Sequence, residues 1–528
     1  MASQAEAVSG DRPSGSAHGR VSRGGQGLAL ATLCTLLFLT FLDNTVVSVA
    51  LGYIQVDLKA NVSDLQWVVG AYALTFASIM LACGMIGDEL GRKKVMLAGA
   101  GVFCAGSVLC ALAPNVQTLI AGRAVMGLGA AASEPGTLSM LRQLYPDAKA
   151  RSRAIGVWAA TSGFALAMGP VVGGILVGVW NWRGIFWFNL AFGLAALIVA
   201  AIVLPESSDP TAARVDTAGT LLGAVTLGAF VFAIIYAESA GFGSAVTIVL
   251  LCVSVAGAVA FVWRERRAAN PLLDLKYLRV PQFTTANIVA MFTYFSTFAI
   301  FFFTALYMVI VVGASGFKLA LVFLPMTVLM IVASVLAGRW TVVVGLRWSI
   351  VIGCLLLAVG LFLTQGYLGP HPSYGPLIVA LSLAGIGIGT TVVPITSAVL
   401  AAVPAERSGM AASATNTSRE IGAVTGVAIL GSLMFSQLHV SLVAQMNHLH
   451  VPAIYQGIVI TDLETGNFTV PPGLSAELKK LETELTHVAY TAFHTGLRAA
   501  LFLSAGLAVL AALLALITLR TRQVDAGS

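Results

Sequence analysis

Charged side chains inside long apolar stretches are the residues of this chain best placed to do chemistry. Asp43 lies in the apolar run 28–51, and Arg123 lies in the run 117–142. A carboxylate inside a membrane span is costly unless it is paired or hydrated, and it is by default a functional hypothesis. Arginine keeps its proton, so Arg123 needs an acid or backbone carbonyls as its partner. We therefore expect Asp43 and Arg123 to pair and to handle protons; the alternative is an inert structural ion pair.

Two further acids lie in apolar runs. Glu134 is followed by Pro135, which lacks an N–H and so frees a backbone carbonyl that could hold a proton or a water molecule. At a helix end, Glu134 could instead face the cytoplasm. Glu420 follows Arg419, about a third of the way into a span that begins near Gly409. We interpret Glu134 and Glu420 as further proton or cation sites, and a local or interhelical ion pair explains Glu420 equally well.

Aromatic and amide side chains near these charges are candidates for a ligand pocket. Trp67, Tyr72 and Phe76 lie in the run 66–87, whose span must neighbour that of Asp43. The faces of aromatic rings attract cations, so such a pocket would suit lipophilic cations. Two polar residues close to the acids in sequence are assigned to the same pocket: Asn44 and Asn416.

These residues must be positioned by membrane-spanning helices. Hydrophobic residues make up 58% of the chain and charged residues 10%, whereas an ordinary soluble protein is about 25% charged. We predict an all-α, polytopic membrane protein with spans near the following ranges: 28–51, 66–87, 95–113, 117–142, 154–179, 184–204, 217–238, 245–263, 283–312, 317–344, 347–366, 377–402, 409–438 and 493–519.

The distribution of basic residues orients these spans. Gly84 to Lys94 reads G-M-I-G-D-E-L-G-R-K-K, a glycine-rich turn whose three consecutive cations indicate the cytoplasm. Most lysines and arginines of the loops fall on that same side. Fourteen spans therefore place both termini in the cytoplasm. The opposite side carries only a few: Lys59, Arg183, Lys318, Lys479, Lys480 and Arg498.

Glycines in the fifth run favour close helix packing. Gly163 to Gly174 reads G-F-A-L-A-M-G-P-V-V-G-G. Gly169 and Gly173 are four residues apart, a spacing of small residues that brings helix backbones together. Pro170 between them bends the helix.

Three motifs together resemble the fourteen-span drug:proton antiporter branch of the major facilitator superfamily. They are the turn at 84–94, the run L-D-N-T-V-V-S-V-A-L from Leu42, and G-P-V-V-G-G at 169–174. The segment around Arg123 is similar to the proton-linked fourth-helix motif of that family. The resemblance covers roughly residues 28 to 519. The sequence departs from the family pattern at several positions, which are Ser48, Gly52, Glu89, Met126 and Ala165.

The resemblance implies a fold and roles. The fold would be two six-helix bundles plus two extra spans. Asp88, Gly91 and Arg92 would form a cytoplasmic conformational latch. A helix-bend gate would comprise Gly169, Pro170, Gly173 and Gly174. Asp43 with Arg123 would couple protons.

The expected domains follow from that fold. They are a disordered cytoplasmic tail at 1–26, a first bundle at 27–204, a two-span insert with linker at 205–282, a second bundle at 283–519, and a cytoplasmic tail at 520–528. Within the second bundle, 440–490 would be an external loop, with a small hairpin around Glu464–Gly466 and helical spacing over 474–490.

The favoured hypothesis is a monomeric antiporter in a bacterial inner membrane. It would export lipophilic, cationic compounds from the cytoplasm in exchange for protons, with lipid around it. A dedicated exporter of one metabolite, lipid, siderophore or antibiotic is the first alternative, and a non-transporting receptor is the second. We expect no enzyme, because no nucleophile–base pair or metal cluster converges. No ATP-binding motif occurs, so the proton motive force would supply the energy and no cofactor, metal or nucleic acid is expected.

Overall fold

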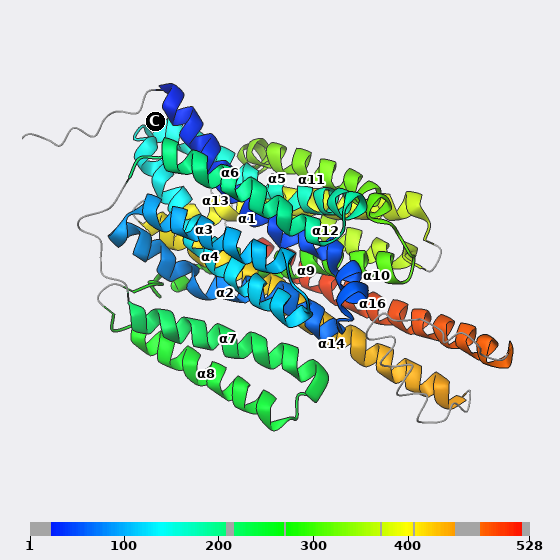
Figure 1. Ribbon diagram of the computed structural model, residues 1–528. Coiled ribbons are helices and arrows are strands. Elements are labelled where there is room, and N and C mark those ends of the chain that lie inside the picture. The colour runs from blue at the N-terminus through cyan, green and yellow to red at the C-terminus, as the bar shows by residue number, and fades with distance from the viewer. Residues whose placement is uncertain are drawn as a thin grey trace, which may run out of the picture.

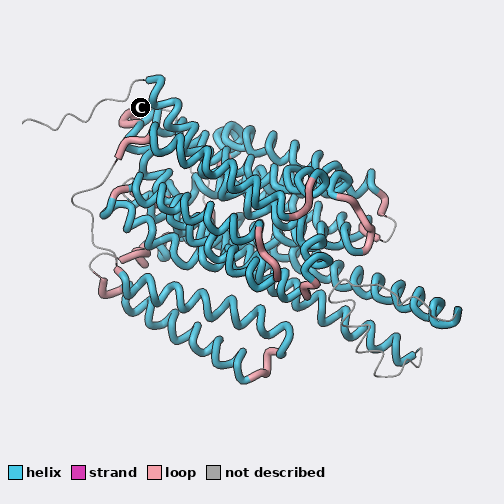
Figure 2. The backbone as a smooth tube through the Cα atoms, viewed as in Figure 1, coloured by secondary structure: helices cyan, strands magenta, loops and turns pink. Residues whose placement is uncertain are grey.

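The computed structural model describes residues 23–206, 216–268, 271–369, 372–404, 407–448 and 476–519. Figures 1 and 2 show long helices lying side by side, with short loops at their ends. The described residues contain no strand, and the prediction of an all-α, polytopic protein is confirmed. Within the described part of the chain, eleven segments are long and apolar enough to cross a membrane. Three further long helices fall outside that set, α2, α4 and α14, and buried charges lower the hydropathy of the last two.

The first six helices form one group. They are α1 (Arg23–Leu58), α2 (Val62–Leu90), α3 (Arg92–Ala111), α4 (Val116–Leu144), α5 (Ala148–Val179) and α6 (Arg183–Val203). α1 packs against α5 and α6, and α4 packs against α2 and α3. Asn61, Asn115 and Asp147 cap α2, α4 and α5 by accepting a hydrogen bond from a backbone N–H of the first turn. Gln26 of α1 donates to the carbonyl of Leu144 at 2.9 Å, so the start of α1 lies beside the end of α4.

The next two helices form a pair at one edge of the bundle (Figure 1). α7 (Thr217–Ala240) packs along α8 (Ala245–Glu265), and α7 also contacts α2 and α14. Val231 and Ile235 of α7 are buried in one cluster with Ala73 of α2 and Val424 of α14. The pair therefore packs, through α7, against the place where α2 contacts α14.

The base of this helix pair is fixed by Asp216 at the start of α7. Its carboxylate accepts a hydrogen bond from the N–H of Gly219 at 3.1 Å and forms an ion pair with Arg264 of α8 at 3.0 Å. Burial acts to raise the pKa of Asp216, but the bonds from Arg264 and Gly219 outweigh burial. The pKa of this carboxyl group therefore lies below its ordinary value.

The last group is built from α9 (Pro281–Phe298), the π-helical turn η2 (Ala299–Thr304), α10 (Ala305–Ile310), α11 (Gly316–Val344), α12 (Leu346–Tyr367), α13 (Tyr374–Ala401), α14 (Ser408–His448) and α16 (Ala476–Thr518). α14 and α16 extend past the ends of their neighbours (Figure 1). The helix expected over 474–490 is the first part of α16. The hairpin expected around Glu464–Gly466 lies outside the described residues.

The two groups meet mainly where α2 packs on α14, α5 on α11 and α1 on α10, and α5 also contacts α13 and α4 contacts α14. Tyr53 of α1 donates to the carbonyl of Ala314 at 3.1 Å, and Thr327 of α11 donates to the carbonyl of Ala167 at 2.7 Å. We call the helices α1–α6 the first bundle, the helices α9–α16 the second bundle, and their contact surface the seam. The buried charges lie in and beside this seam.

Candidate functional site

A buried ion pair inside the first bundle joins Asp43 of α1 to Arg123 of α4. Nη1 of Arg123 donates to Oδ2 of Asp43, and the two side chains are 1% and 0% exposed. Oδ1 of Asp43 accepts a hydrogen bond from Nδ2 of Asn189 on α6 at 2.6 Å. The expected pairing of Asp43 with Arg123 is confirmed, and each oxygen of the carboxylate has a donor.

Arg123 is held on three sides. Besides Asp43, its Nε donates to the carbonyl of Val68 on α2 at 2.9 Å, and its guanidinium lies 4.4 Å from the ring centroid of Tyr72. The Tyr72 hydroxyl donates to the carbonyl of Thr40 at 3.2 Å, and its ring stacks on Phe76 with centroids 6.0 Å apart. An acid, a carbonyl and an aromatic face together satisfy a charge that cannot be lost by deprotonation.

Asn44, the residue after Asp43, faces the second bundle. Its Nδ2 donates to Oε1 of Glu420 on α14 at 2.9 Å. Successive residues of a helix project about 100° apart. Neighbouring positions on α1 therefore serve different partners, with Asp43 bound inside the first bundle and Asn44 bound across the seam.

Glu134 of α4, in the first bundle, accepts a hydrogen bond from the second bundle. Nδ2 of Asn416 on α14 donates to its Oε1. Arg419 donates to Oδ1 of Asn416 at 3.1 Å and to the Thr396 hydroxyl at 2.8 Å, and its guanidinium lies 5.4 Å from the ring centroid of Tyr294. The sequence analysis left open an ion pair between Arg419 and Glu420; the described contacts of Arg419 are with uncharged side chains instead.

Both glutamates keep one oxygen available. Oε2 of Glu134 and Oε2 of Glu420 have no hydrogen-bond partner among the described residues, and the side chains are 1% and 2% exposed. A buried carboxylate oxygen without a donor is a position where a proton or a donor group of a ligand can bind.

The acids lie at different depths. Arg123 and Glu134 are eleven residues apart on α4, close to three turns, so they share one face about 16 Å apart along the axis. Gly136, two residues after Glu134, lies beside Arg92 at the turn between α2 and α3. Glu134 therefore lies toward the end that carries this turn, and Asp43 with Arg123 lies toward the other end.

The glycines of α5 permit two close contacts. A Cβ added at Gly173 would lie 2.7 Å from the carbonyl oxygen of Val46 on α1, and Gly169 abuts Thr45 of the same helix. A Cβ at Gly174 would lie 2.6 Å from the carbonyl oxygen of Gly316 on α11, across the seam. The expected close packing is confirmed, and α5, with Pro170 in its interior, touches both bundles.

The turn between α2 and α3 depends on Gly91. Its φ of 110° lies in the region that favours glycine, and its N–H donates to the carbonyl of Gly87 at 3.1 Å. Lys93 donates to the carbonyl of Ala201 at the end of α6 at 2.7 Å. The side chain of Asp88 lies outside the described part, so its latch contact with Arg92 stays a prediction.

Trp67 lies on a different face of α2 from Tyr72 and Phe76. Its ring packs on Phe232 of α7, with centroids 5.1 Å apart. Tyr72 and Phe76 are one turn apart and are buried with the charges, whereas Trp67 contacts the helix pair α7–α8. Among the predicted pocket aromatics, the structure brings only Tyr72 and Phe76 to the ion pair.

The sequence analysis missed Asn189, which completes the shell of Asp43. The residue is fully buried in α6, within the apolar sequence F-W-F-N-L-A-F. An amide inside an apolar run has to find a hydrogen-bond partner when it is buried. That signal was available in the sequence, although the identity of the partner was not.

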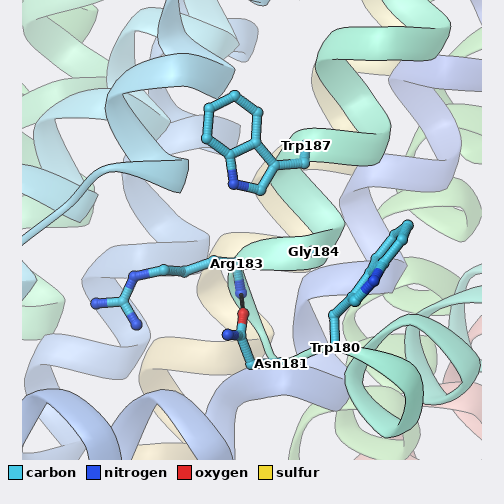
Figure 3. A pocket seen from close by; sticks show the side chains of 5 residues that line it. All are labelled: Trp180, Asn181, Arg183, Gly184 and Trp187. Atoms are coloured by element: carbon cyan, nitrogen blue, oxygen red, sulfur yellow. Dashed lines mark hydrogen bonds between the residues drawn. The ribbon is translucent and has the colours of Figure 1, made fainter.

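An open hollow lies at the start of α6 (Figure 3). It is lined by Trp180, Asn181, Arg183, Gly184 and Trp187. Arg183 forms an ion pair with Asp57 at 2.6 Å, and Trp180 is 66% exposed. Exposed tryptophans beside a cation are typical of a membrane–water interface, so we interpret this hollow as interfacial surface.

Comparison with known proteins gives consistent results. The family model described as Major Facilitator Superfamily matches residues 33–427. The chain is 35% identical over 406 residues to the multidrug resistance protein Stp of Mycobacterium tuberculosis (strain ATCC 25618 / H37Rv), covering 77% of this chain and 75% of that protein. It is 34% identical to the methylenomycin A resistance protein of Streptomyces coelicolor, covering 78% and 86%.

A solved structure shares the fold. It is the bacterial homolog to the human lysosomal transporter Spinster in its inward-facing and unoccupied conformation. The TM-score is 0.63 at 17% identity, covering 93% of this chain and 98% of that one.

Proposed function

The chain belongs to the major facilitator superfamily, and is thus a membrane transporter and not an enzyme; on this premise we propose that it exports lipophilic, cationic drugs in exchange for protons. Its relatives are bacterial, which indicates the bacterial inner membrane. We further propose fourteen spans, counting α9–α10 as one and including α2, α4 and α14. In this topology both termini face the cytoplasm, and one chain suffices for transport.

The observation that carries the proposal is the shell of Asp43. A carboxylate bound by a guanidinium and an amide, and fully buried, has no obvious use in a passive scaffold. Protonation neutralises the carboxyl group of Asp43 and removes its attraction to Arg123, which keeps its own charge. This loss of attraction frees Arg123 to move relative to α1, which is the kind of change that alternating access requires.

The proposed cycle uses the acids at their different depths. Asp43 takes a proton from outside when the seam opens outward, while the drug leaves. Glu420 lies close to the level of Asp43, because it accepts from Asn44, and Glu134 lies nearer the cytoplasm. Both receive protons or the cationic group of the drug on their available Oε2 atoms. Tyr72, Phe76 and Tyr294 supply aromatic surface beside these charges.

Two groups of residues would control the change between outward-open and inward-open conformations. One is the turn between α2 and α3, and the other is the set of glycines with Pro170 in α5. We propose that Asp88, Gly91 and Arg92 latch the cytoplasmic end while the outer end is open. The bend at Pro170 and the close contacts of Gly169, Gly173 and Gly174 would let α5 move against α1 and α11.

A dedicated exporter of one antibiotic is the second candidate. It is favoured by the relative named for resistance to a single compound, methylenomycin A. The two candidates differ in breadth of substrate. A receptor that transports nothing is disfavoured by the acids buried in and beside the seam, which are Asp43, Glu134 and Glu420.

Inverted membrane vesicles with an imposed pH gradient test the proposal. Substrate-dependent proton release is measured for a panel that contains ethidium as a lipophilic cation, neutral lipophilic antibiotics and acidic ones. Responses to several chemically unrelated cations support multidrug export, and a response to one chemotype supports the dedicated exporter. Substrate flux that is unaffected when the pH gradient is collapsed would contradict proton coupling.

A further inference from the structure

Two of the described hydrogen bonds across the seam join an amide to a carboxylate, and they run in opposite directions. Asn44 of the first bundle donates to Glu420 of the second at 2.9 Å, and Asn416 of the second bundle donates to Glu134 of the first. Each bundle thus contributes one amide donor and one carboxylate acceptor. All four side chains are buried, with exposed fractions of 5% or less.

We infer that these crossed amide–carboxylate contacts hold the two bundles together, and that Asn44 and Asn416 are positioning residues for the change of access. We call the arrangement in which both contacts are formed the closed state. The inference rests on the proposed alternating-access function. The pocket role that the sequence analysis assigned to the two asparagines stays a prediction beside this one. We call the contacts Asn44–Glu420 and Asn416–Glu134 the crossed bridges.

The chemistry of the acceptors explains why the crossed bridges restrain opening. Oε2 of each glutamate has no hydrogen-bond partner among the described residues. Within that part of the chain, the asparagine amide is therefore the donor on which each glutamate carboxylate depends. Separating the bundles removes that donor from a buried acid. A buried acid without a donor is strongly unfavourable unless water, a proton or a cationic ligand replaces the amide. Opening is therefore favourable only when a replacement arrives.

The orientation of each amide is fixed by its neighbours. Oδ1 of Asn416 accepts from Arg419 at 3.1 Å, and therefore its NH₂ group must face Glu134. Asn44 follows Asp43, whose carboxylate is tied to Arg123 and Asn189. The ion pair of the first bundle thus fixes the part of α1 that presents Asn44 to Glu420, which links the state of Asp43 to the seam.

The test measures the distance between the bundles directly. Spin labels are placed in pairs at exposed positions, Lys94 with Arg339 and Leu112 with Phe317, after Cys34 and Cys252 are replaced. Distances are recorded in lipid nanodiscs without drug and without a pH gradient. The readout therefore does not depend on whether the protein exports any drug, and a failure of drug export is distinguishable from a failure of this inference.

Removal of either donor should open the protein. Asn44→Leu and Asn416→Leu are expected to shift the distance distribution of at least one label pair from the closed population to longer distances. Asn44→Ala and Asn416→Ala remove the donor with a smaller side chain and are expected to give the same shift, which keeps the test valid if the leucine variants fold poorly. Asn287→Leu is the matched control, because Asn287 is a buried asparagine whose contacts lie within the second bundle.

Exchange of the partners separates a bridge from simple packing. The double variant Asn44→Glu with Glu420→Asn puts the acid on the first bundle and the amide on the second, and it should return the distribution to the closed population. The same holds for Glu134→Asn with Asn416→Glu. Closed distributions in all four single variants, or open single variants that no exchange restores, would overturn the inference.

Discussion

Asn189 of α6 donates a hydrogen bond of 2.6 Å to Asp43 of α1, on the carboxylate oxygen that Arg123 leaves unused. The carboxylate therefore has two donors from two helices. One of them is charged and the other is neutral. The neutral donor stays in place when Asp43 gains a proton, so it can keep the carboxyl group oriented while Arg123 moves away.

Replacement of Asn189 should weaken coupling without unfolding the protein. A hydrogen bond to a charged group contributes about 1.5–3 kcal/mol, so Asn189→Leu should reduce proton-coupled export by roughly ten-fold or more. Export is measured in proteoliposomes at a fixed pH gradient, together with the amount of protein inserted. Asn287→Leu, a substitution of the same type outside the seam, serves as control. Equal export by the Asn189→Leu variant and wild type would show that the amide has no part in coupling.

The ion pair should show strong thermodynamic coupling. Removing one member of a buried pair leaves an uncompensated charge and typically costs about 3–5 kcal/mol. Arg123→Gln should therefore lower the melting temperature markedly, and the double variant Arg123→Gln with Asp43→Asn should recover part of the loss. Thermal unfolding of the purified protein gives the interaction energy by a double-mutant cycle. Additive effects of the two substitutions would contradict a direct, buried interaction.

The small residues of α5 should tolerate enlargement very unevenly. A Cβ at Gly173 would lie 2.7 Å from the carbonyl oxygen of Val46, so Gly173→Ala is expected to destabilise the protein by about 1–3 kcal/mol. Gly156 lies on the same helix with nothing within 4 Å of an added Cβ, and Gly156→Ala should be neutral or slightly stabilising. Melting temperatures of the two variants in one detergent provide the comparison. Equal melting temperatures for the two variants would contradict the claim that the α1–α5 contact excludes a side chain at Gly173.

The sequence predicted the helices and the central ion pair for clear physical reasons. Apolar runs of span length must form helices in a membrane because each backbone polar group has to be satisfied within the segment. Asp43 and Arg123 were recognisable because a charge inside such a run needs a partner. Asp43 was the partner expected for Arg123 because each of the two lies within an apolar run.

The contacts across the seam could not be predicted in the same way. Asn44 and Asn416 carry no charge, and their partners Glu420 and Glu134 lie hundreds of residues away in the chain. Only the packing of α14 against the first bundle brings these groups together. Helix periodicity, by contrast, already separates Trp67 from Tyr72, since five residues rotate the side chain about 140° around the axis.

The central claim is that Asp43 exchanges its partner Arg123 for a proton during export. The most direct measurement compares wild type with Asp43→Asn in proteoliposomes, recording pH-gradient-driven export and, separately, downhill flux of ethidium without a gradient. Asp57→Asn, which alters a partly exposed acid paired with Arg183, is the control. The account predicts that Asp43→Asn abolishes gradient-driven accumulation while downhill flux persists and the control behaves as wild type. Full gradient-driven export by the Asp43→Asn variant would contradict it.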